Sequence, residues 1–206
     1  YNQINNNTMA SLLDKVQDAV RTGTVGTEVK RSAQWFRDKI KGLEGTLKNQ
    51  WSRTNAPKFY REAENKLDRR ALGLKGNLGE LFAYYYNPKH RETLPYYDRF
   101  PLIMLIGIDS NKKTFLGLNF HYLNPKWRAV LLDRVSAKVT SGAIINWNKI
   151  AKVPMIMPTV KRYRFDHIVR RVIPIEEQDN ELAIFLPLER FKKASKSKVW
   201  ANSRGR

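Results

Sequence analysis

The first hydrophobic pattern along the chain has the 3.6-residue period of amphipathic helices. Thr8 precedes one such pattern and predicts a capped helix that ends at the Gly23–Gly26 stretch, with apolar positions Met9, Leu12, Leu13, Val16 and Val20. A second helix is predicted from about Glu28 to Leu43. A third is predicted to begin at Pro57, because proline is well tolerated in the first turn of a helix.

The second predicted helix carries a narrow apolar stripe. Its positions recur at intervals of four and three residues, as in a coiled-coil seam, and are Val29, Ala33, Phe36, Ile40 and Leu43. Little other apolar sequence lies nearby for these side chains to cover. We therefore expect an assembly seam that packs on neighbouring subunits, so that Phe36→Asp would abolish incorporation into a particle and leave residues 76–190 folded.

From Gly76 onward the pattern changes to short aliphatic and aromatic runs that are bounded by turn residues. These runs predict strands at Glu80–Tyr86, Leu102–Ile108, Thr114–Tyr122, Val169–Ile175 and Glu181–Leu186. A turn at Asp109–Lys113 joins the second strand to the third as a hairpin. Asn124-Pro125 predicts the cap of a helix, a shorter helix is expected over Ile144–Ala151, and the end is expected to hold a short helix and a basic tail.

This succession of elements predicts an α+β fold. N-terminal amphipathic helices precede a small, partly open β-barrel of the SH3-like or OB-like kind, with helices inserted between its strands. The corresponding organisation is a helical assembly arm over residues 1–75, a barrel domain over 76–190 and a basic C-terminal tail over 191–206.

The net positive charge of the chain indicates the kind of partner that the protein binds. The 206 residues contain 38 Lys and Arg against 19 Asp and Glu, a formal net charge of +19. The excess is +7 over residues 1–75, +1 over 76–125, +6 over 126–180 and +5 over 181–206. The nearly neutral middle is typical of a core, and the basic flanks indicate contact with a polyanion or with acidic subunits.

The densest basic runs are the candidate polyanion-binding residues. They comprise Lys152, Lys161, Arg162, Arg164, Arg170, Arg171, Lys192 and Lys193. Alternate residues of a strand face opposite ways, so at least one pair within Lys161–Arg164 must reach solvent or a partner. Planar guanidinium groups suit phosphate or carboxylate forks, and such contacts bring affinity without base-sequence readout.

The sequence contains no pattern that is typical of a catalytic or metal-binding site. The chain has no cysteine, and the spacing of His90, His121 and His167 matches no metal motif. His121 is expected to be a barrel-wall histidine that bonds to the backbone. We therefore expect a protein that is not an enzyme and has no catalytic residue, no metal, no cofactor and no small-molecule substrate. A metal-dependent nuclease stays the weakest alternative, because it would need convergent carboxylates, for which only Glu80, Asp98 and Asp109 lie near strand ends.

Asp98 is expected to act structurally, as an acceptor for backbone N–H groups in a turn flanked by prolines. Asp98→Asn should then lower stability by about 1 kcal/mol, the value of one lost hydrogen bond.

Two interpretations remain open for the tyrosine clusters Tyr84–Tyr86 and Tyr96-Tyr97. They either fill the barrel and its loops, or they stack on nucleobases beside the neighbouring basic residues.

Membrane insertion and secretion are not indicated. The longest apolar run, Phe100–Ile108, contains Pro101 and is too short to cross a bilayer. The first residues have neither the basic start nor the apolar centre of a signal peptide. The chain begins with Tyr1 and not with Met, so its natural start is expected to lie upstream.

Several segments carry a resemblance to a known family. They are Leu94-Pro-Tyr-Tyr-Asp-Arg-Phe-Pro-Leu-Ile103, the run Phe115–Leu123 with Arg128, Glu181-Leu-Ala-Ile-Phe-Leu-Pro187 and Lys198-Val-Trp-Ala-Asn-Ser203. Together they are similar to small virion proteins of T-even-like contractile-tailed phages, of the kind labelled DNA end protectors. The resemblance covers most of residues 9–203 and implies a virion component that is assembled in the host cytoplasm.

Two functional interpretations follow. The first is a non-enzymatic structural component of the neck, tail or baseplate, whose partners are other virion proteins and packaged double-stranded DNA. The alternative is a protein that covers duplex ends without sequence specificity and so protects them from nucleases.

Overall fold

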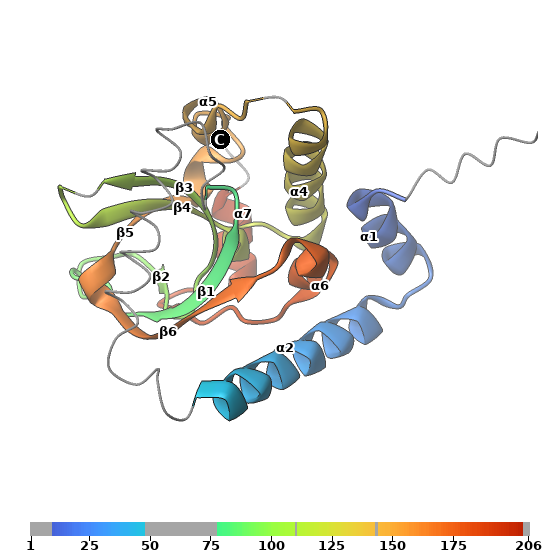
Figure 1. Cartoon of the computed structure of the whole chain (residues 1–206), viewed down its shortest axis with the longest axis horizontal. Helices are drawn as coiled ribbons and strands as arrows, with labels where there is room; N and C mark the ends of the chain where they lie inside the picture. The colour runs from blue at the N-terminus through green and yellow to red at the C-terminus, as the bar shows by residue number, and fades with distance from the viewer. Residues whose placement is uncertain (1–9, 48–77, 110, 143, 204–206) are drawn as a thin grey trace, which may run out of the picture.

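The computed structural model describes residues 10–47, 78–109, 111–142 and 144–203 (Figure 1). A five-stranded antiparallel sheet lies at its centre. Its strands are β1 (Leu81–Tyr86), β3 (Leu102–Asp109), β4 (Thr114–Asn119), β5 (Val160–Arg164) and β6 (Ile168–Ile175), in the spatial order β5-β4-β3-β1-β6. Three of the predicted strands and the hairpin at Asp109–Lys113 are confirmed by β1, β3 and β4, and β6 confirms the run that begins near Val169.

The sheet curls into a half-barrel because its two edge strands, β5 and β6, are joined by one 3-10 turn, η3 (Phe165–His167). The backbone N–H of Arg164 donates to the Tyr86 hydroxyl at 3.1 Å, and that of Asn87 donates to the carbonyl of His167 at 3.0 Å. Side chains from all five strands meet inside the curl: Phe82, Tyr84, Tyr86, Ile103, Leu105, Phe115, Tyr163, Ile168 and Val172. The sheet thus has a buried face on each side.

Both faces of β4 are therefore buried. Phe115 and Asn119 lie on the inner side, where Asn119 donates to the Tyr163 hydroxyl at 3.2 Å. Gly117 lies between them under Ile103. A Cβ at Gly117 would come within 2.7 Å of Ile103 Cδ1, so the close approach of β3 and β4 requires glycine here.

Helices cover the outer face of the sheet in two layers (Figure 1). The inner layer is α4 (Pro125–Thr140) and α6 (Asn180–Phe185), and the outer layer is α1 (Leu12–Arg21) and α2 (Val25–Leu47). The Asn124 side chain accepts from Trp127 N at 3.1 Å, so Asn124-Pro125 caps and begins α4 as the sequence predicted. Ser11, rather than Thr8, caps α1, with its hydroxyl 3.1 Å from Asp14 N.

The strand predicted at Glu181–Leu186 is wrong, because this segment forms α6. A short apolar run has no period long enough to separate a strand from a buried helical turn. The helix buries Ala183, Ile184 and Phe185 between the sheet and the outer helices. It also lets Glu181 form ion pairs with both Lys15 of α1 and Arg31 of α2.

The outer helices α1 and α2 pack on the rest of the same chain. The sequence had instead predicted that the apolar stripe of the second helix would pack on neighbouring subunits. Phe36 is only 4% exposed and contacts Phe100 edge-on at 6.1 Å between ring centroids. Val29 and Ile40 pack against the same core, and Ala33 is half-buried; for Leu43 only the backbone is described. Asp133 of α4 accepts from the backbone N–H groups of Leu12 and Leu13, both at 2.9 Å. The described residues of the seam therefore pack within the chain.

The remaining elements are short. They are β2 (Tyr97–Asp98), which pairs with β7 (Phe191–Lys192), α5 (Trp147–Ala151) and α7 (Lys196–Ser203), with the 3-10 turns η1 (Phe120–Tyr122), η2 (Met157–Thr159) and η4 (Glu177–Asp179). Residues 191–203 are thus a strand and a helix that pack on the body, and Val199 is fully buried. The helix predicted from Pro57 lies outside the described residues.

Candidate nucleic-acid interface

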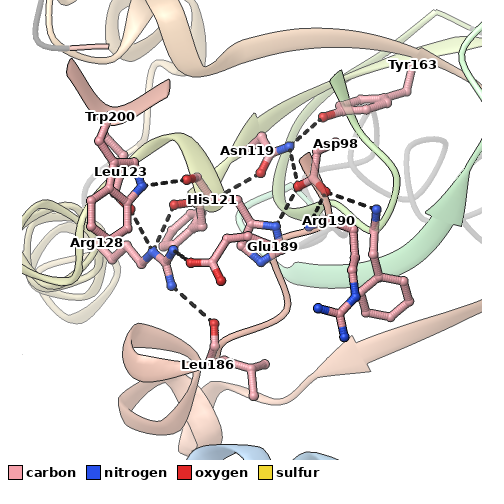
Figure 2. Close-up of polar contacts among 12 residues, drawn as sticks. Asp98, Asn119, His121, Leu123, Arg128, Tyr163, Leu186, Glu189, Arg190 and Trp200 are labelled. Carbon is pink, nitrogen blue, oxygen red and sulfur yellow. Dashed lines mark hydrogen bonds and ion pairs between the residues drawn. The ribbon is translucent and has the colours of Figure 1, made fainter. Parts of the chain in front are cut away.

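A buried carboxylate, Asp98, lies at the centre of a polar network beneath the candidate interface (Figure 2). One carboxylate oxygen accepts from Phe100 N at 3.0 Å and from Arg190 N at 3.1 Å. The other lies 2.6 Å from His121 Nδ1 and accepts from Asn119 Nδ2 at 3.3 Å. The structural role predicted for Asp98 is confirmed at Phe100 N, and the network also ties β4 and the segment before β7 to the same turn.

The partner of His121 differs from the one expected. Its ring bonds to the Asp98 carboxylate and not to the backbone. The pair has the composition of an acid–base couple, but the His121 side chain is fully buried, and its Nε2 has no hydrogen-bond partner in the described part of the chain. A substrate has no access to this ring, so the geometry supports a structural pair.

The environment of Asp98 favours its charged form. Burial alone would raise the pKa of Asp98, but the charge and hydrogen bond of His121, with the N–H groups of Phe100 and Arg190, outweigh burial and hold the pKa below its usual value. A carboxyl whose pKa is lowered by folding stabilises the protein above its unfolded pKa, near 3.9. That contribution is lost as the pH falls through the lower, folded value.

We accordingly expect Asp98→Asn to lower the free energy of unfolding at pH 7 by about 2–3 kcal/mol, more than one neutral hydrogen bond, because a charged acceptor with four donors is removed. The stability of the variant should also fall less between about pH 5 and pH 2 than that of the wild type. Denaturant titrations at stepped pH measure both effects, with the exposed Asp18→Asn as control. Equal stability at pH 7, or an equally steep acid limb, would contradict this role.

Arg128 is a second buried charge that ties the network to the helices (Figure 2). Its side chain is 1% exposed. Its Nε donates to the carbonyls of Phe120 and Leu123, each at 2.9 Å, and one terminal nitrogen donates to the carbonyl of Ile184 at 3.0 Å. The other terminal nitrogen lies 2.7 Å from a carboxylate oxygen of Glu189. Arg128 therefore fixes η1, α6 and the segment before β7 relative to α4.

Sequence reasoning noted Arg128 only within the family resemblance. A signal was available, because Arg128 lies on the helical stripe of Leu131, Leu132 and Val135, which is the buried face of α4. An arginine on an apolar stripe indicates a buried charge that needs acceptors. Two of its acceptors, the carbonyl of Ile184 and the carboxylate of Glu189, are more than fifty residues away, and the sequence could not identify them.

The candidate polyanion-binding residues of β5 separate as the strand alternation predicts. Tyr163 is buried inside the half-barrel, and Lys161 is half-buried on the same side. Arg162 is exposed and Arg164 half-exposed, and Arg164 forms a two-bonded ion pair with Asp166, at 2.9 and 2.6 Å. Arg170 and Arg171 are on β6, where only their backbone is described.

The other candidate residues lie in two places. Lys152 is exposed at the C-terminal cap of α5, and Lys192 is exposed on β7. The ammonium group of Lys193 donates to three carbonyls of the loop before β2, those of Arg91, Glu92 and Leu94, at 2.8, 2.7 and 3.2 Å. Lys193 therefore holds this loop in place and is less available to a phosphate than Lys192.

The two interpretations of the tyrosine clusters are resolved for two of the rings. Tyr84 and Tyr86 are buried inside the half-barrel, and burial raises the pKa of each hydroxyl. Tyr85 is 41% exposed but packs edge-on against Phe100, 4.4 Å between centroids. Tyr84 and Tyr86 are therefore core and not stacking platforms for bases, whereas Tyr85 keeps an exposed surface.

One long stretch of the chain contains basic residues and no acidic ones. Between residues 134 and 165 there are seven Lys and Arg and no Asp or Glu.

Within residues 10–47, 78–109, 111–142 and 144–203, no group of three His, Asp or Glu side chains is placed to hold a metal ion. In the same ranges no helix is long and apolar enough to span a membrane.

Comparison with known proteins agrees with a protein that acts on DNA. The curated proteins and the solved structures gave no match to this chain. A protein-family model described as Phage T4 terminal DNA protecting protein matches residues 3–204. Because this match spans almost the whole chain, the protein belongs to the family of phage T4 terminal DNA protecting proteins.

Proposed function

We propose that this protein binds the ends of double-stranded DNA and shields them from nucleases, without reading base sequence and without cutting the DNA. The observation that carries the proposal is the family match over residues 3–204. It favours the alternative of the two sequence-based interpretations over a structural part of the neck, tail or baseplate. Association with the virion, and contacts with other virion proteins, are part of this proposal.

The charge distribution supports the proposal independently of the family. Exposed Lys and Arg side chains without acidic neighbours in the sequence attract the phosphate backbone, and this attraction does not depend on base sequence. Exposed Lys152, Arg162 and Lys192 supply side chains for such contacts. The curled sheet gives Arg162 a rigid base, because inner and outer apolar clusters fix the sheet from both sides.

We further propose that the half-barrel is of the SH3-like kind. An OB-fold is a Greek-key barrel, whereas here β1, β3, β4 and β5 follow one another across the sheet and β6 returns beside β1. The single 3-10 turn between β5 and β6 is consistent with this arrangement. The proposal concerns architecture alone, because one such barrel supports many functions.

Replacing Arg162, Arg164, Arg170 and Arg171 together with Gln is expected to weaken DNA binding and leave the fold intact. Each lost phosphate contact should lower the slope of log K against log salt by roughly one unit. Gel-shift titrations at two or more salt concentrations measure the slope. A matched control changes Arg21, Lys30, Arg37 and Lys41 to Gln, which removes the same charge from the exposed faces of α1 and α2, outside the sheet that contains β5 and β6.

The proposal requires tight, salt-sensitive binding by the wild type and a larger loss in the β5–β6 variant than in its control. Equal losses of DNA affinity in the two variants would show that only net charge matters. These four arginines would then not be part of the interface. No binding of linear DNA at low salt would contradict the proposed function itself.

A further inference from the structure

An aromatic pocket lies beside the candidate interface, and no residue of it belongs to the basic runs discussed so far. Its volume is about 360 Å³, within the range of sites that hold small ligands. Three segments distant in sequence line it: η1 with the start of α4, the loop after α5, and α7. The lining residues are Tyr122, Leu123, Asn124, Trp127, Pro154, Met155, Trp200 and Ser203.

Each of the three rings in this pocket has a lysine beside it. The Lys161 ammonium lies 4.4 Å from the centroid of Tyr122. Lys196 lies 5.0 Å from the Trp200 ring, and Lys126 lies 5.8 Å from the Trp127 ring. Aromatic walls with lysines around them are the combination by which proteins hold single nucleotides, since the rings stack on a base and the cations meet its phosphates.

Lys161 is the least satisfied of these cations. Burial lowers the pKa of its ammonium group, and among the described residues no carboxylate or carbonyl pairs with it. A half-buried ammonium without a counter-ion is costly, and an incoming phosphate would relieve that cost. The first turn of α4 opens on the same pocket, and the partial positive charge of a helix N-terminus acts in the same direction.

The pocket walls are fixed before any ligand arrives. Trp200 Nε1 donates to the carbonyl of His121 at 2.8 Å, which anchors the indole against the buried network (Figure 2). Arg128 bonds to the carbonyls of Phe120 and Leu123 on either side of Tyr122. A binding site whose walls are locked by buried hydrogen bonds loses little conformational entropy when it is filled.

Resting on the proposed function, we propose that this pocket takes up the terminal nucleotide of a DNA end, with its base among Tyr122, Trp127 and Trp200 and its phosphate at Lys161. A base inside a duplex is stacked and paired on both sides, whereas the last pair opens at low cost, so only an end can fill the pocket readily. Phosphate contacts alone do not distinguish ends from the duplex interior. The pocket supplies that distinction, because stacking on an aromatic ring strengthens binding by about 5- to 150-fold per base.

The test uses the full chain and two duplexes of one sequence, with the fluorescent base 2-aminopurine at the last pair or at a central pair. The wild type should change the emission of the terminal probe and leave that of the central probe nearly unchanged. Trp127→Leu and Trp200→Leu should each lower the preference for linear over closed circular duplex by about tenfold. Affinity for the circle should stay near the wild-type value.

Trp35→Leu is the matched control, because Trp35 is a half-buried tryptophan of α2 outside the pocket. If Trp200→Leu fails to fold in a thermal scan, Trp127→Leu carries the test, since Trp127 is only half-buried in the first turn of α4. An unchanged end preference in the folded pocket variants would overturn the inference and leave the proposed function standing. Wild-type protein that binds neither duplex would overturn both.

Discussion

Replacing Arg128 with Met is expected to lower the free energy of unfolding by about 3–5 kcal/mol, the cost of removing one partner of a buried ion pair. The change removes the Arg128 donors from the carbonyls of Phe120, Leu123 and Ile184. It also leaves the carboxylate of Glu189, whose side chain is 9% exposed, without its ion-pair partner. Burial acts to raise the pKa of Glu189, and the charge of Arg128 is the main influence that holds it below its usual value. Without Arg128, the pKa of Glu189 should rise.

Denaturant unfolding of Arg128→Met, Glu189→Gln and the double variant measures the coupling between the two side chains. The double variant should lose less than the sum of the single losses, because no charge is then left unpaired. Arg134→Met, at an exposed position of the same helix, should change stability by no more than about 0.5 kcal/mol. A loss below about 1 kcal/mol in Arg128→Met would mean that the network contributes little to the fold.

Phe36→Asp is the second change with a large expected effect. Truncating a buried phenylalanine alone costs about 3–5 kcal/mol, and a carboxylate placed in the same site adds a desolvation penalty. Phe36 is 4% exposed against Phe100, so the variant should unfold as a whole at lower denaturant. This replaces the sequence-based expectation that only assembly would suffer.

Hydrogen exchange distinguishes the two outcomes for Phe36→Asp. If α1 and α2 are part of one cooperative fold, protection should fall in β1 and β3 as well as in α2. Lys30→Asp, at an exposed position of the same helix, should leave protection unchanged. Loss of protection confined to α1 and α2, with the sheet as stable as in the wild type, would restore the idea of a separable arm.

Four of the five strands of the central sheet could be predicted because they carry their own signals. Leu102–Ile108 and Thr114–Asn119 are apolar runs separated by a turn sequence, and their register follows from that turn. Asn124-Pro125 is an equally local signal for the start of α4. The pairing of β2 with β7 could not be predicted, because two-residue strands have no measurable period.

The candidate site could be predicted only in part, for a related reason. Basic runs are visible in a linear sequence, and so is the outward alternation of Arg162 and Arg164. The buried network and the aromatic pocket are not visible, because Asp98, Arg128 and Trp200 find their partners through folding. Their positions depend on the packing of α4, α6 and α7 around the sheet, and one of these helices was predicted as a strand.

The most direct measurement of the central claim is exonuclease digestion of a linear duplex in the presence of the protein, with competitor DNA added. Protection should persist when closed circular duplex is present in excess and should be lost when short linear duplexes of equal total mass supply many more ends. That result would establish binding at ends. Digestion at the rate of unprotected DNA, or equal competition by circles and short linear duplexes at equal mass, would contradict it.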